Sequence, residues 1–84
     1  MNIKEFEPTL FHLREANEEI EELILEMNAG PIDADVFKVW MAHIYHHVNS
    51  AWNTRFVTSL DDPILHEKFH EFATHPTDIV AWEV

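Results

Sequence analysis

The histidines are the residues of this chain whose type and spacing suggest chemistry. Seven occur among its 84 residues. His43 and His47 are four positions apart, and so are His66 and His70. Side chains four positions apart on a helix lie on the same face, one above the other. Two imidazoles held in this way chelate Zn²⁺ or another transition metal such as Ni²⁺, so both pairs are candidate metal ligands.

The second pair belongs to a longer motif, because His66, Glu67 and His70 form the string H-E-x-x-H. In zinc peptidases the two histidines of this string bind the ion and the glutamate polarises a water. Those enzymes also need a third ligand, a substrate-binding strand and a much longer chain. We therefore expect that the protein is not an enzyme. The one enzymatic alternative is a metal-dependent hydrolase that uses His66, Glu67 and His70. The alternative for all the histidines is ring packing against Trp and Phe.

Composition removes several other kinds of site. The chain has no cysteine and a single glycine. The first fact excludes disulfides, thiolate metal sites and thiol nucleophiles. The second excludes the glycine-rich loops that cradle phosphates. The sequence defines no Ser-His-Asp arrangement either.

The charge balance limits the partners. Five Lys and Arg face 16 Asp and Glu, which gives a formal net charge of −11. Nucleic-acid binding needs clustered basic residues, and these five are scattered, so we expect no direct nucleic-acid contact. No apolar run approaches 18 residues and the start is not basic and then apolar, so we expect no membrane span and a cytoplasmic location. The acidity suits a basic protein partner, including one that the chain inhibits by mimicking a polyanion.

The elements that must position these residues are helices. Apolar periodicity predicts helices over about 8–28, 33–58 and 63–74. Gly30 suits a left-handed cap after the first helix, and Asp33 suits an N-cap for the second. Asp62, followed by a proline at the first helical position, predicts the start of the third. The first helix carries a heptad seam that we expect to face the second, and Ala16 and Leu23 widen it. The seam positions are Phe6, Leu10, Leu13, Asn17, Ile20, Ile24 and Met27.

The predicted architecture is one all-α domain spanning residues 1–84. It is a long antiparallel helical hairpin with a short third helix and an apolar C-terminal tail, 77–84, packed on the bundle. The register of the hairpin brings Asn17 near His47. We predict a hydrogen bond between them, because an unpaired buried amide costs about 1–3 kcal/mol. The alternative is that Asn17 lies at the edge of the seam and bonds water.

Some apolar residues are left over by this packing. Phe11 and Leu25 interrupt the polar side of the first helix. The second helix, which carries Trp40 and Trp52, is longer than the helices expected to pack on it. Dimerisation into a four-helix-like core would bury such a surface. We therefore predict a small acidic module for protein–protein interaction that forms a homodimer. The alternatives are a metal-binding protein that uses its histidine pairs and a polyanion mimic.

Overall fold

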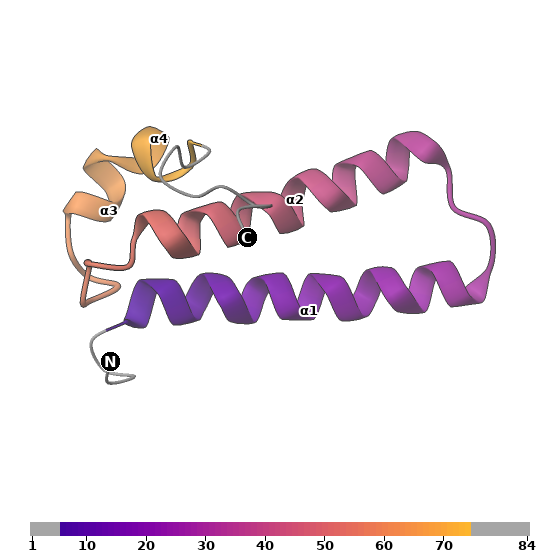
Figure 1. Ribbon diagram of the computed structural model, residues 1–84, viewed down its shortest axis with the longest axis horizontal. Coiled ribbons are helices and arrows are strands. Elements are labelled where there is room, and N and C mark those ends of the chain that lie inside the picture. The colour runs from indigo at the N-terminus through magenta and orange to yellow at the C-terminus, as the bar shows by residue number, and fades with distance from the viewer. Residues whose placement is uncertain (1–5, 75–84) are drawn as a thin grey trace, which may run out of the picture.

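The computed structural model describes residues 6–74, and within that range every regular element is a helix. Figure 1 shows α1 and α2 lying side by side and antiparallel, with α3 and α4 folded back along α2 on the side away from α1. The all-α hairpin is therefore confirmed. The predicted packing of the tail lies outside the described residues. The helices are α1 (Glu7–Ala29), α2 (Ala34–Asn53), α3 (Ile64–Glu67) and α4 (Phe69–Phe72).

The turn of the hairpin follows the sequence signals with one exception. The Asp33 carboxylate accepts the Asp35 amide at 2.8 Å, so the predicted N-cap of α2 is confirmed. Gly30, however, has φ 161° and ψ −174°, and the left-handed cap predicted there is wrong. Its backbone is extended because the residue before a proline, here Pro31, avoids helical angles.

The second helix is shorter than predicted, since α2 ends at Asn53 and not near residue 58. The Thr54 hydroxyl donates to the Ser50 carbonyl at 2.7 Å, and the Thr54 amide donates to the same oxygen at 2.9 Å. The Val57 amide then turns back to the Thr54 carbonyl at 2.9 Å. β-Branched side chains lose rotamer freedom in a helix, and here the turn buries Val57 instead of extending α2.

The third helix is divided in two. At Lys68 the backbone (φ −109°, ψ 22°) leaves the helical region, which separates α3 from α4. The prediction of one helix over 63–74 is therefore wrong. The Asp62 Oδ1 accepts the Ile64 amide at 3.0 Å, but the N-cap of α3 is Pro63, one residue later than predicted. A segment this short is a marginal helix alone. It is held instead by Asn53 of α2, whose side-chain nitrogen donates to the carbonyls of Phe72 and Thr74 at 2.7 and 2.6 Å.

The core between α1 and α2 uses one edge of the apolar stripe on α1. Ala16 and Leu23 are buried there, and Ile44 and Ala51 are buried on α2. The small alanines let the backbones approach closely, and the Thr9 hydroxyl donates to the Ala51 carbonyl at 2.7 Å. The buried apolar residues of the described chain are Ala16, Leu23, Ile44, Ala51, Val57 and Phe72.

The helix interface therefore runs along Ala16 and Leu23, which widen the predicted seam, and the seam itself is open from Leu13 onward. Leu13, Ile20 and Ile24 are 40–52% exposed. Leu13 precedes Ala16 by three residues, which is a rotation of about 60° around the helix. The stripe is wide enough that α1 packs with its Ala16 edge and leaves the Leu13 edge open.

No helix in residues 6–74 combines the length and apolar character that crossing a lipid bilayer requires.

Candidate metal centre

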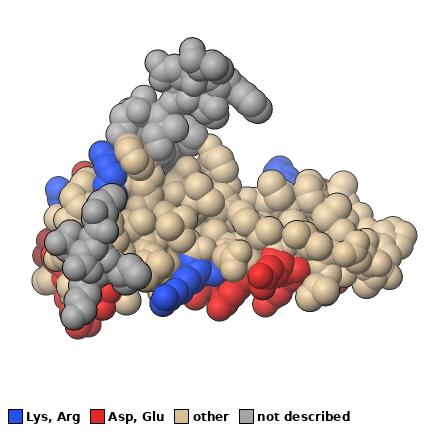
Figure 2. All heavy atoms as spheres, turned by 60° about the horizontal axis from the view of Figure 1, so that its bottom comes forward, with Lys and Arg blue, Asp and Glu red and all other residues tan. Residues whose placement is uncertain are grey.

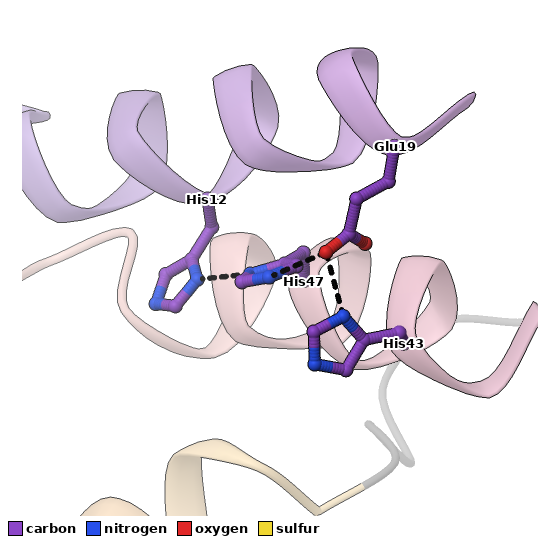
Figure 3. Close-up of polar contacts among 4 residues, drawn as sticks. All are labelled: His12, Glu19, His43 and His47. Atoms are coloured by element: carbon purple, nitrogen blue, oxygen red, sulfur yellow. Dashed lines mark hydrogen bonds and ion pairs between the residues drawn. The ribbon is translucent and has the colours of Figure 1, made fainter. Parts of the chain in front are cut away.

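The hairpin joins histidines of α2 to two residues of α1. His12 and Glu19 are seven positions apart, so they lie two turns apart on one side of α1. His43 and His47 lie one turn apart on α2. Figure 3 shows the Glu19 carboxylate between the rings of His43 and His47, with the His12 ring beyond His47.

Three side chains of this group point potential ligand atoms at one another. The Nδ1 atom of His43 lies 2.6 Å from Oε1 of Glu19, and Nε2 of His47 lies 3.6 Å from the same oxygen. One ligand atom from each residue falls within 4.8 Å of the other two. In the described part of the chain this is the one group of His, Cys, Asp or Glu side chains with such geometry.

His12 is the fourth member of the cluster and contacts His47. The Nδ1 atoms of His12 and His47 lie 3.0 Å apart, so one ring donates a proton and the other accepts it. Burial, and then the nearby charges of His47 and His46, lower the pKa of His12 to about 4. Burial of the His46 ring, and then the charges of His47 and His43, lower the pKa of His46. The charge of Glu19 partly opposes this shift. His12 is therefore neutral at pH 7.

Glu19 is an unusual carboxylate for so acidic a chain. Its side chain is only 15% exposed, whereas α1 carries most of its glutamates in solvent. Oε1 faces the two histidines, but Oε2 is buried and has no hydrogen-bond partner. A buried oxygen without a hydrogen-bond partner is costly. The described residues therefore leave one oxygen of this carboxylate unsatisfied.

An open groove borders the cluster. It has a volume of ≈ 580 Å³ and is lined by both carboxylates and apolar side chains. Both Glu19 and His43 contribute to its wall, and the His43 side chain is 65% exposed. The cluster is thus reachable from solvent. The lining residues are Glu19, Glu22, Asp35, Val36, Val39, Trp40 and His43.

The structure treats the two predicted histidine pairs differently. It brings His43 and His47 together with the Glu19 carboxylate. His66 and His70 lie on separate short helices, α3 and α4, and both are exposed. The expectation that they share one helical face is wrong, because the chain leaves the helix at Lys68 between them.

Two members of the cluster escaped the sequence reasoning. The sequence analysis singles out neither His12 nor Glu19, because His12 has no histidine four positions away and Glu19 is one of seven glutamates on α1. The signal that could have found them is their spacing with Ala16 and Leu23, since positions 12, 16, 19 and 23 follow one line along a helix. The predicted hydrogen bond between Asn17 and His47 is wrong. Asn17 is exposed, and the His47 ring nitrogens face His12 and Glu19.

The residues predicted for an interaction surface are dispersed. Phe11 and Leu25 are exposed on α1 at 43% and 68%. Leu25 is nine positions from Ala16, which puts it on the side of α1 away from α2. Trp40 is half-buried in the groove wall. Trp52 is half-buried, with the Arg55 guanidinium 3.9 Å above its ring.

No protein-family model, curated protein or solved structure matches this chain.

Proposed function

We propose that this chain is a self-associating interaction module in which one face of the hairpin takes a second copy. The observation that carries the proposal is the apolar edge left open by the packing of α1 on α2. Its side chains are 37–52% exposed although all are large and apolar. They are Leu13, Ile20, Ile24, Met27, Phe37, Met41, Tyr45 and Val48, and we refer to them as the apolar face.

These residues share one side of the hairpin. On α1, Leu13 and Ile20 fall about 40–60° from Ala16, in the rotational sense opposite to Glu19. On α2, Met41 and Val48 fall on the side of Ile44 opposite to the clustered histidines. Because Glu19 contacts the histidines of α2, both helices present that cluster on one side. Both therefore present the apolar face on the other side.

The charged side chains lie at the borders of the apolar face, where Lys38 lines a hollow together with Phe37, Met41 and Tyr45. No residue of the apolar face is ionised at pH 7, and Asn17 is the polar residue nearest its centre on α1. Figure 2 shows Asp and Glu, with Lys or Arg beside them, along the lower edge of the view, and a broad surface without these four residue types above them. A face without charge gives a strongly charged partner nothing to pair with. It suits a surface of the same character, which a second copy supplies.

The size of the face fits a dimer. Eight large side chains about half exposed present on the order of 800 Å², which is what each partner contributes to a standard interface. The largest apolar patch of a typical monomer is roughly 300–600 Å². Pairing two hairpins through this face would make a four-helix core, the arrangement in which amphipathic helices bury both sides of a wide apolar stripe.

Two further features support an interaction role and not an enzymatic one. The H-E-x-x-H string is broken by Lys68, so His66 and His70 lack the continuous helix on which zinc peptidases hold their ligands. The carboxylates of α1 remain outside the proposed interface. They would keep a dimer soluble and leave it able to attract a basic partner.

Light scattering coupled to size-exclusion chromatography tests the proposal. The expected mass of the full chain at high micromolar concentration is twice 9.9 kDa. Ile20→Glu puts a charge at the centre of the apolar face and is expected to give a monomer with unchanged helical circular dichroism. Leu25→Glu, on the outer side of the same helix, is the matched control and should stay dimeric.

A monomeric wild-type chain at high micromolar concentration would overturn the proposal. A chain ending at Thr74 then identifies the reason. If that shorter chain associates while the full chain does not, residues 75–84 of the same molecule occupy the face. If Leu25→Glu and Ile20→Glu dissociate the dimer equally, the interface lies elsewhere or surrounds the hairpin.

A further inference from the structure

We infer that Glu19, His43 and His47 form a binding site for a first-row divalent transition metal such as Zn²⁺ or Ni²⁺, with His12 orienting His47. The site lies on the side of the hairpin opposite to the apolar face. It is independent of the proposed self-association, and the experiments below separate the two.

The first support is the spacing of the ligand atoms. Ligands at about 2.0–2.1 Å from a tetrahedral ion lie about 3.3 Å from one another. The two measured separations, 2.6 and 3.6 Å from Oε1 of Glu19, bracket that value. The shorter one opens by rotation of His43, whose side chain is 65% exposed and free to adjust. The longer one exceeds a good hydrogen bond, so no proton bridges His47 and Glu19 well.

The second support is the orphaned carboxylate oxygen. Oε2 of Glu19 is buried without a partner, although its carboxylate already meets a histidine through Oε1. A divalent cation at the cluster would neutralise the carboxylate and can be approached by either oxygen. Two imidazoles with one carboxylate are a donor set that favours Zn²⁺, Ni²⁺ or Co²⁺ over Mg²⁺ and Ca²⁺, which prefer oxygen ligands.

The third support is the contact behind His47. A metal-bound histidine usually donates its second ring N–H to an acceptor, which fixes the tautomer and the ring plane. Nδ1 of His12, 3.0 Å from Nδ1 of His47, stands where that acceptor is needed. When His47 donates to His12, its Nε2 carries a lone pair directed at Glu19. Two electron-rich atoms then face one another, and a cation between them turns repulsion into binding.

The coordination would remain incomplete on the protein side. Three protein ligands leave at least one position of a tetrahedral ion for water or another donor. Glu19 and His43 line the ≈ 580 Å³ groove, so that position is reached from solvent. An exposed site of this kind exchanges its metal more readily than a closed structural site.

Calorimetric titration of the full chain with Zn²⁺, Ni²⁺ and Mg²⁺ tests the inference. One Zn²⁺ or Ni²⁺ per chain is expected, and no heat with Mg²⁺. His43→Ala, His47→Ala and Glu19→Gln should each raise the Kd about tenfold or more, and His12→Phe about tenfold. The matched control is His66→Ala with His70→Ala, which removes an exposed pair with the same spacing and should change the Kd less than twofold.

A second readout does not depend on the variants folding. Co²⁺ bound to the wild-type chain should give the visible absorption of a four-coordinate site with nitrogen and oxygen ligands. The inference is overturned if the wild type takes up no Zn²⁺ or Ni²⁺, or if the Kd of His43→Ala and His47→Ala stays within about twofold of the wild-type Kd. Loss of binding in the His66/His70 double variant would move the site to the second pair, which also overturns it.

Discussion

The Nδ1 atoms of His12 and His47 lie 3.0 Å apart across the α1–α2 interface. The two Nδ1 atoms share one proton, and both rings cannot carry a proton at Nδ1 at once without placing two N–H groups against each other. A third histidine ring is close to both, because the centroid of His46 is 5.2 Å from that of His47 and 6.2 Å from that of His12. The stability of the hairpin is therefore tied to the charge state of a histidine cluster.

The first prediction is that the metal-free protein loses stability as the pH falls from 7 to 5. The pKa of His12 is lowered to about 4 in the folded protein, against about 6.5 unfolded. Between these values the unfolded chain binds more protons, so the free energy of unfolding falls with falling pH. From pH 7 to pH 5 this contribution is about 2 kcal/mol. Urea titrations with a chelator present, at constant protein concentration, measure it.

His12→Gln should flatten this dependence, because the side chain no longer titrates. His66→Gln is the control, since that histidine is exposed on α3, and its slope should match the wild type. If the His12→Gln and wild-type chains lose the same free energy between pH 7 and pH 5, the pH dependence has another origin.

The second prediction concerns the hydrogen bonds by which Asn53 of α2 holds the segment that contains α4. Asn53→Ala removes the donor that reaches the carbonyls of Phe72 and Thr74. The expected cost is about 1–3 kcal/mol, and the segment 64–74 should open more often than the hairpin. Hydrogen exchange resolved by segment measures this. Asn28→Ala, at an exposed position near the end of α1, should leave hydrogen exchange in 64–74 unchanged. Equal exchange in the two variants would mean that the Asn53 hydrogen bonds do not hold this segment.

The third prediction concerns the N-cap of α2. Asp33→Ala removes the acceptor of the Asp35 amide and is expected to destabilise the fold by about 1 kcal/mol. Asp33→Ser keeps a capping oxygen and should recover most of that loss. Thermal and urea unfolding compare the three chains. A loss in Asp33→Ser as large as in Asp33→Ala would mean that charge near the helix start, and not the hydrogen bond, is what matters.

Local signals predicted the hairpin well, whereas rotation about the helix axes was not predictable from them. The caps, breaks and 3.6-residue period depend on neighbouring residues, so Asp33 and the α1 bounds could be read directly. The apolar stripe on α1 is broad. Its amphipathic pattern predicts that the stripe is buried, but it does not predict which part of the stripe contacts α2. Ala16 and Ala51 decided the rotation because small residues allow close approach. That rotation turned Glu19 inward and left Leu13 and Ile20 open.

The fourth prediction tests this account of the rotation. Ala16→Leu inserts a large side chain where α1 meets α2 and is expected to cost about 1–3 kcal/mol. Because the insertion pushes the helices apart, it should also weaken the His12–His47 contact. Ala42→Leu, at an exposed position of α2, should have little effect on the unfolding free energy. Equal unfolding free energies for the two variants would mean that Ala16 does not control the approach of the helices.

The last prediction is that self-association and metal binding separate, because their residues occupy opposite sides of one hairpin. Ile20→Glu should give a monomer that still binds one Zn²⁺ with a Kd within about threefold of the wild type, since Ile20 and Glu19 point to different sides. His43→Ala should bind Zn²⁺ at least about tenfold more weakly and remain a dimer. Measuring both properties on both variants decides the matter. Loss of both properties in either variant would show that the two sides form one interface, in which case an ion bridges two copies and the arrangement proposed for the dimer is wrong.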